Sequence, residues 1–80
     1  MERQEIFSEI QQILRNILND EELILQEGTS ANDIPGWDSL THIDLIEEIE
    51  NKYDIKFSMG EIVLLKNVSD FVDLIQKKIS

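Results

Sequence analysis

The spacing of apolar residues over the first part of the chain restricts the fold more than any other feature. These residues recur every three or four positions, which is the period of one face of an α-helix: Ile6, Ile10, Ile13, Leu14, Ile17 and Leu18. The chain has 80 residues and no cysteine, so other helices must cover this face in one small core that no disulfide supports. The pattern predicts an amphipathic helix from about Glu2 to Asn19.

A second helix is predicted to begin near Asp38-Ser39 and to end within Asn51-Lys52-Tyr53-Asp54. Acidic residues alternate with its apolar ones, so one side of the helix is acidic. The stripe expected to face the core consists of Leu40, Ile43, Ile46 and Ile49, with Leu45 adding width and Tyr53 closing it.

Capping patterns predict a short third helix and a closing fourth. Ser58-Met59-Gly60-Glu61 has the spacing of a capping box, which opens a helix through about Leu64. Ser69 can cap the last helix, whose apolar face contains Phe71 and Ile75. The expected fold is all-α: a small antiparallel bundle of three main helices plus one short helix, in a single domain over residues 1–80.

Residues 20–38 have no sustained period and are predicted to form a long first loop. The apolar trio Leu23-Ile24-Leu25 is expected to pin this loop across the bundle, and Pro35-Gly36 fits the central positions of a type II turn. Because a loop of this length is uncommon in a small domain, it is usually functional.

The charge balance narrows the classes of partner. Seven basic residues oppose seventeen acidic ones, for a formal net charge of −10. This excess disfavours nucleic acid and anionic membranes and suits basic protein surfaces, although it also serves solubility. No apolar run approaches the roughly 20 residues that span a bilayer, and the acidic start of the chain lacks the layout of a signal peptide. We expect a cytoplasmic monomer that binds neither nucleic acid nor membrane.

Few residues could support catalysis or hold a metal. The one histidine, His42, follows Ser39 by three positions, so a serine–histidine pair is geometrically possible on a helix. The surrounding residues lack the glycines of a nucleophile elbow, which makes a hydrolase the most distant alternative. One histidine without cysteine cannot form a zinc site, and the acidic residues match no EF-hand loop. We expect no enzyme, no catalytic residue and no metal.

Ser39 has two interpretations. The simplest is a helix N-cap, whose hydroxyl accepts a bond from a free backbone N–H. Ser39 also closes the long Pro/Gly loop, opens an acidic helix and lies near the middle of the chain. The segment Gly36-Trp37-Asp38-Ser39-Leu40, followed by Ile43-Asp44-Leu45-Ile46, resembles the phosphopantetheine attachment segment of acyl carrier proteins. The match in helix order, length and charge covers nearly the whole chain.

The resemblance implies a covalent cofactor. In this family, the serine at the position of Ser39 is esterified by 4′-phosphopantetheine, taken from coenzyme A by a separate, magnesium-dependent phosphopantetheinyl transferase. The terminal thiol of the arm then holds acyl groups as thioesters and carries them between enzymes of fatty-acid, polyketide or related biosynthesis. A phosphate at a helix N-terminus lies near favourable dipole charge.

The resemblance also implies that the second helix is the docking face. Leu40 and Ile43 would form a small apolar centre, and the carboxylates would steer basic patches on acyl-loading, condensing or transferring enzymes. Because Leu40 and Ile43 also fit the inner stripe, ordinary core positions remain the alternative for both. The residues expected to face partners are Asp38, Leu40, Ile43, Asp44, Glu47 and Glu48.

Some positions depart from the family pattern. Trp37 stands where fatty-acid carriers usually have a small residue, and Thr41 and His42 are uncommon after the Asp-Ser-Leu triplet. A tryptophan at this place is more typical of carriers in polyketide, mixed peptide or cell-envelope pathways, so the cargo stays open. The alternatives are a peptidyl or aminoacyl carrier of a non-ribosomal pathway and an acidic helical adaptor that is not modified.

Overall fold

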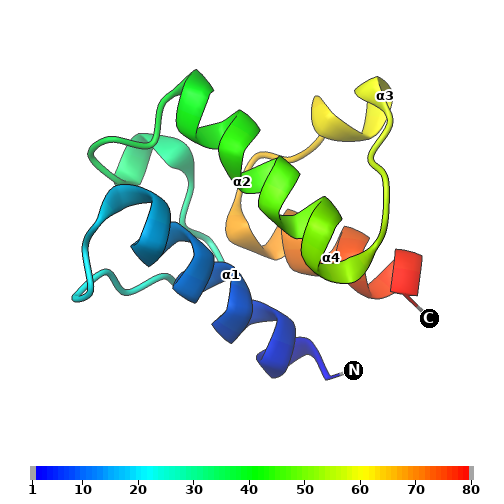
Figure 1. Cartoon of the computed structure of the whole chain (residues 1–80), viewed down its shortest axis with the longest axis horizontal. Coiled ribbons are helices and arrows are strands. Elements are labelled where there is room, and N and C mark those ends of the chain that lie inside the picture. The colour runs from blue at the N-terminus through cyan, green and yellow to red at the C-terminus, as the bar shows by residue number, and fades with distance from the viewer. Residues whose placement is uncertain (1, 80) are drawn as a thin grey trace.

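Four α-helices and one short 3₁₀-helix follow one another along residues 2–79, the part of the chain that the computed structural model describes. Figure 1 shows their order, from the blue N-terminal helix to the red C-terminal one. Their bounds are α1 Arg3–Leu18, η1 Ala31–Asp33, α2 Ser39–Tyr53, α3 Met59–Ile62 and α4 Val68–Ile79.

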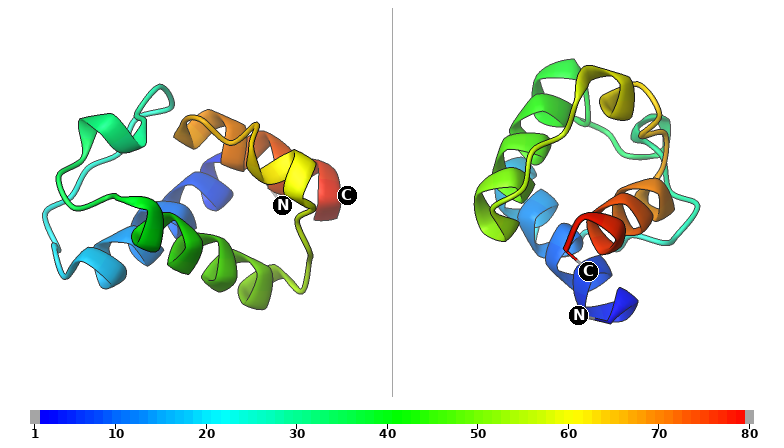
Figure 2. Two further views of the ribbon diagram at one scale, coloured as in Figure 1. Left: turned by 90° about the horizontal axis from the view of Figure 1, so that it is seen from above. Right: turned by 90° about the vertical axis from the view of Figure 1, so that its right-hand side faces the viewer.

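The three longer helices form the bundle. Helix α1 packs against both α2 and α4 and runs antiparallel to each of them (Figure 1). Figure 2 shows the short α3, which follows α2 and precedes α4 in the chain, on the side of the molecule away from α1. The expected arrangement of three main helices and one short helix is confirmed.

The helix ends follow from local residue chemistry. Helix α1 begins with a capping box between Glu2 and Glu5, and it ends at Asn19, whose φ of 53° is left-handed. Helix α2 ends in the same way at Asp54, with a φ of 55°. The predicted capping box of Ser58 and Glu61 opens α3, and it lowers the pKa of the Glu61 carboxyl because the backbone N–H of Ser58 donates to it.

The core lies where α1, α2 and α4 meet. Ile6, Ile10 and Leu14 of α1 are fully buried there, as are Phe71 and other residues of α4. The connecting segments also contribute. The buried apolar residues are Ile6, Ile10, Leu14, Leu23, Leu25, Trp37, Leu45, Ile46, Ile49, Phe57, Leu65, Val68, Phe71, Val72 and Ile75.

The long first loop is held against α1 as expected, but by two residues of the apolar trio. Leu23 and Leu25 are buried, whereas Ile24 is 72% exposed, so the prediction is wrong for Ile24. Alternate residues of an extended segment point in opposite directions, which separates Ile24 from its neighbours. The backbone N–H of Leu25 donates to Gln11 Oε1 at 2.8 Å and fixes the segment.

The N-cap of α4 differs from the predicted Ser69. The helix begins at Val68, and the backbone N–H of Asp70 donates to Asn67 Oδ1 at 3.0 Å, so Asn67 and not Ser69 provides the capping oxygen. Ser69 Oγ instead accepts a bond from Arg3 Nη2 at 2.9 Å. Arg3 also pairs with Glu27 and Asp73, and in this way it joins α1, the loop and α4.

Extended pairing is minimal, in agreement with an all-α fold. Within residues 2–79 it consists of one isolated bridge between Ser30 and Asn67, which ties the first loop to the start of α4. A helix that spans a bilayer needs both sufficient length and high hydropathy, and none of the helices within the described residues combines the two.

Candidate functional site

The turn before α2 fixes where that helix starts. Gly36 has a φ of 90°, and the backbone N–H of Trp37 donates to the carbonyl oxygen of Ile34 at 3.2 Å, as the predicted type II turn requires. Thr41 Oγ1 donates to the carbonyl oxygen of Gly36 at 2.9 Å. Because Thr41 is buried, this bond joins the turn to the inner face of α2.

Asp38, and not Ser39, is the N-cap of α2. The backbone N–H of Thr41 donates to Asp38 Oδ1 at 2.9 Å, and this bond is the main cause of the lowered pKa of the Asp38 carboxyl. The interpretation of Ser39 as a cap is therefore wrong, because the preceding aspartate already satisfies the free N–H. Ser39 is the first residue of α2, and it is exposed.

Trp37 forms an aromatic support beneath this helix start. Its side chain is buried, and its indole N–H donates to His42 Nδ1 at 3.2 Å. Both rings contact the fully buried Phe71 of α4, with centroid separations of 6.3 Å from Trp37 and 5.5 Å from His42. The start of α2 is thus fixed to α4 as well as to the turn.

His42 is not arranged as a base for Ser39. Its Nδ1 is occupied by the bond from Trp37, and within residues 2–79 no hydrogen bond joins it to Ser39. Half-burial lowers the pKa of His42 because it desolvates the charged form. Among the described residues there is also no group of three or more histidine, cysteine, aspartate or glutamate side chains that could hold a metal ion.

Leu40 and Ile43, for which the sequence allowed either a docking or a core position, lie on the outer face of α2. Leu40 is 69% exposed and Ile43 is 54% exposed, whereas Leu45, Ile46 and Ile49 are buried. The part of the predicted inner stripe that contained Leu40 and Ile43 is therefore wrong. The helix face that points inward contains Thr41 in their place.

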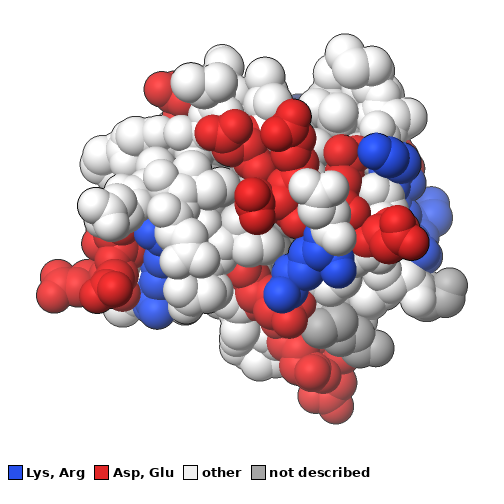
Figure 3. Space-filling model, in the orientation of Figure 1, with Lys and Arg blue, Asp and Glu red and all other residues white. Residues whose placement is uncertain are grey.

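Carboxylates surround the exposed apolar pair. Asp38, Asp44, Glu47 and Glu48 are all exposed, and Figure 3 shows acidic side chains gathered over α2. The one basic residue of α2 is Lys52 in its last turn, and it pairs with Glu9 of α1 at 3.6 Å. The first turns of α2 therefore present a small apolar surface inside a negative field.

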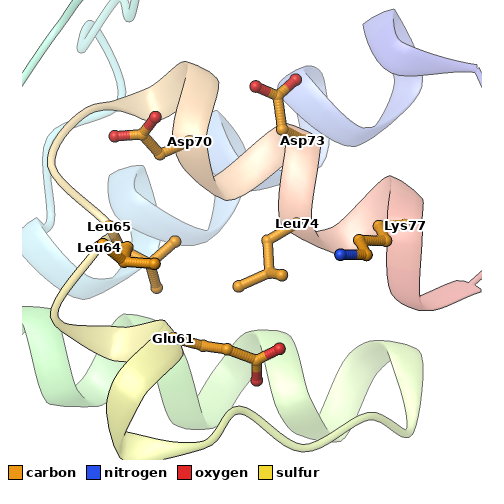
Figure 4. Close-up of a pocket in the computed structure, with 7 residues that line it drawn as sticks. All are labelled: Glu61, Leu64, Leu65, Asp70, Asp73, Leu74 and Lys77. Carbon is orange, nitrogen blue, oxygen red and sulfur yellow. The ribbon is translucent and has the colours of Figure 1, made fainter.

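Two hollows lie near the ends of the helices. The first has a volume of about 420 Å³ and opens beside Ser39, between η1 and α2; it is lined by Ala31, Asn32, Trp37, Asp38, Ser39, His42 and Ile43. The second has about 230 Å³ and lies between α3 and α4 (Figure 4), lined by Glu61, Leu64, Leu65, Asp70, Asp73, Leu74 and Lys77. Only the first adjoins the start of α2.

Comparison with known proteins gives consistent findings. A family model described as "Phosphopantetheine attachment site" matches residues 8–75. A protein named "Acyl carrier protein" from Coprothermobacter proteolyticus is 35% identical over 80 residues, which is 99% of this chain and 96% of that protein. Another of the same name from Thermotoga maritima is 32% identical over 78 residues, 96% of this chain and 95% of that protein.

A solved structure is similar as well. The solution NMR structure of a holo acyl carrier protein from Geobacter metallireducens is 44% identical, with a TM-score of 0.86. The match covers 92% of this chain and 85% of that one.

Proposed function

The chain belongs to the acyl carrier proteins, the family with a phosphopantetheine attachment site, and from this premise we propose that Ser39 is the residue that bears the arm. Members of the family carry acyl groups and do not catalyse their conversion. The proposal concerns where the cofactor is attached on this chain and which surface its partner enzymes recognise.

The exposed hydroxyl of Ser39 is the observation that carries the proposal. It lies on the first residue of a 15-residue helix, and within residues 2–79 it has no hydrogen-bond partner. Several other serines are engaged: Ser30 with Asp33, Ser58 with Glu61, and Ser69 with Arg3. Ser39 therefore combines access with a free oxygen at a helix N-terminus, where a phosphate is favoured.

The residues present suit a phosphodiester at this point. Attachment would form a bond from Ser39 Oγ to the pantetheine-bearing phosphorus of coenzyme A, while the bond to the other phosphate breaks and 3′,5′-ADP leaves. The hydroxyl proton would pass to a base on the transferase, since His42 makes no hydrogen bond to Ser39 among the described residues. When attached, the arm supplies a thiol that holds an acyl group as a thioester.

Partner enzymes would dock on the outer face of α2. Leu40 and Ile43 offer an apolar centre that the fold leaves exposed, and Asp44, Glu47 and Glu48 offer charge around it. Interfaces commonly have an apolar core and a polar rim, and complementary charge raises the rate of encounter. This surface suits a transferase or acyl-handling enzyme with a basic rim around an apolar contact.

The pathway we propose is fatty-acid, polyketide or a related acyl biosynthesis. The support is the acidic outer face of α2 and the names of the relatives. A peptidyl or aminoacyl carrier would have the same arm and a different cargo. Incubation of the arm-bearing protein, whose thiol is still free, with acyl ligases and with aminoacyl ligases separates these two functions. Only one class of thioester should accumulate.

Intact-mass spectrometry tests the attachment residue. The protein is incubated with coenzyme A, magnesium and a broad-specificity phosphopantetheinyl transferase. We expect a gain of one phosphopantetheine on the wild type and no gain on Ser39→Ala, while Ser8→Ala, which alters another exposed serine on a helix, still gains it. Circular dichroism should show equal helix content in all three.

Either of two results would overturn the proposal. A mass gain on Ser39→Ala would place the arm on another residue. No gain on folded wild-type protein would instead favour an unmodified acidic adaptor.

A further inference from the structure

The hollow beside Ser39 contains few groups that can donate a hydrogen bond to an anion. Of its lining residues, Ala31 and Ile43 are apolar, and Asp38 carries a negative charge. The Trp37 indole N–H is already used by His42. The remaining side-chain donors with nitrogen are the exposed Asn32 and the half-buried His42.

The bond from Trp37 fixes the tautomer of His42. An indole N–H is a donor only, so the Nδ1 atom that lies 3.2 Å from it must be the acceptor. Because burial favours the neutral imidazole, the single ring proton is then on Nε2. The contacts with Trp37 and Phe71 hold the ring in place from two sides.

The Nε2–H of His42 is accessible to solvent. Within residues 2–79 it has no hydrogen-bond partner, and no buried side-chain nitrogen or oxygen lacks one, so this atom reaches solvent. His42 follows Ser39 by three positions on α2, and side chains at that spacing are neighbours on a helix surface. Both residues line the same hollow.

We propose that His42 is a positioning residue for the arm: its Nε2–H donates to a non-bridging oxygen of the phosphodiester on Ser39 and holds the first bonds of the arm over the hollow. This inference rests on the proposed attachment at Ser39. A hydrogen bond to an ionised oxygen is shorter and stronger than a neutral one. Trp37 acts through His42, because it keeps the proton on the nitrogen that faces the phosphate.

Few charged groups surround His42, so a change in its pKa can be assigned to a specific neighbour. Asp38 is the one charged residue that lines the hollow, and its carboxylate is engaged by Thr41. Phe71, which packs against His42 from α4, is uncharged. A phosphodiester on Ser39 therefore adds a new negative charge to an otherwise unchanged setting.

NMR titration of apo and holo wild-type protein is the test. We expect the pKa of His42, followed by its ring carbon-bound protons, to rise by about 0.5 or more on attachment, because a nearby unit charge stabilises the imidazolium. The ³¹P shift of the phosphodiester, which does not itself titrate near neutral pH, should then show an inflection at that same pKa.

Variants separate positioning from a structural role. Holo His42→Phe should lose the ³¹P inflection. His42→Gln keeps an N–H donor but cannot titrate, so its ³¹P shift should stay near the neutral-pH value of the wild type at every pH. Trp37→Phe should move the ³¹P shift away from the wild-type value above the pKa of His42, where the imidazole is neutral, because the ring proton is then free to occupy Nδ1. Circular dichroism of each variant checks the fold.

The outcomes distinguish this inference from the proposed function. If no arm attaches to Ser39, the proposed function fails. If the arm attaches there but His42 titrates identically in apo and holo protein, and the ³¹P shift is flat, the positioning role alone is overturned.

Discussion

The inner and outer faces of α2 contrast sharply, although similar residue types occupy both. On the inner face Leu45 and Ile49 are fully buried, while on the outer face Leu40 and Ile43 are 69% and 54% exposed. Burial of an apolar side chain contributes to stability, but the same side chain left in water contributes little. The contrast indicates that the inner face maintains the fold and that the outer face is available to partners.

The rest of the molecule extends this contrast. Helix α1 packs against both α4 and α2, and Ile6, Ile10, Phe71 and Ile75 of α1 and α4 are fully buried. On α3, by contrast, the apolar side chain of Met59 is 77% exposed. Exposed apolar side chains therefore occur on α3 as well as on the outer face of α2, whereas the faces of α1 and α4 that meet are buried.

The largest expected difference is in stability between two leucines of α2. Leu45→Ala should lower the free energy of unfolding by about 2–5 kcal/mol, because it removes a fully buried side chain and leaves a cavity. Leu40→Ala should change it by less than about 0.5 kcal/mol. Urea unfolding followed by circular dichroism measures both. Equal losses would mean that the two faces do not differ in this way.

A smaller effect on stability is expected from the loss of the Arg3 side chain, which forms ion pairs with Glu27 and Asp73 and a hydrogen bond with Ser69. Arg3→Met should lower the free energy of unfolding by about 1 kcal/mol, since these ion pairs are partly exposed and screened but form a connected network. The difference from wild type should shrink in high salt. A difference that is unchanged by salt would assign the effect to packing of the side chain instead.

The smallest expected effect is a two-step loss of stability in acid. Burial lowers the native pKa of His42 below its ordinary 6.5, so the unfolded chain takes up this proton first. The contribution of neutral His42 is thus full above about 6.5 and lost as pH falls through the native pKa. The lowered carboxyl pKa values of Asp38 and Glu61 give a second loss, below their ordinary 3.8 and 4.5.

Unfolding in urea at a series of pH values separates these two steps. His42→Phe should lack the upper step and keep the lower one. A wild-type protein that becomes more stable as pH falls below 6.5 would contradict the direction of the pKa shift of His42.

The helices could be predicted from the sequence because the spacing of apolar residues and the capping residues indicate the same helix bounds. The ends at Asn19 and Asp54 and the capping box at Ser58 were all recognisable. The sequence does not predict the 3₁₀-helix at Ala31–Asp33, because three residues are too few to show a period, although Ser30 and Asp33 have capping-box spacing. The sequence does not choose between Asn67 and Ser69 as the cap of α4, because both residue types cap helices well. The structure chooses Asn67, whose side chain accepts the bond from the backbone N–H of Asp70.

The rotation of an α-helix per residue is enough to assign the residues of α2 to its inner and outer faces. A helix turns about 100° per residue, so Leu40 and Ile49, nine positions apart, point in opposite directions. Residues spaced three apart drift around the helix, whereas Thr41, Leu45 and Ile49 stay on one face. The bond between Trp37 and His42 could not be predicted in this way, because Trp37 lies in a loop whose path depends on the tertiary fold.

The most direct test of the division between the faces is the second-order rate constant, kcat/KM, for arm attachment by the transferase to two charge-reversed variants. Asp44→Lys/Glu47→Lys changes the outer face of α2, and Glu21→Lys/Glu22→Lys changes exposed residues of the loop. Each variant raises the net charge by four from −10. We predict that kcat/KM falls by about tenfold or more for the α2 variant and stays within about twofold of wild type for the loop variant. Equal rate losses in the two variants would contradict the assignment of α2 as the docking face.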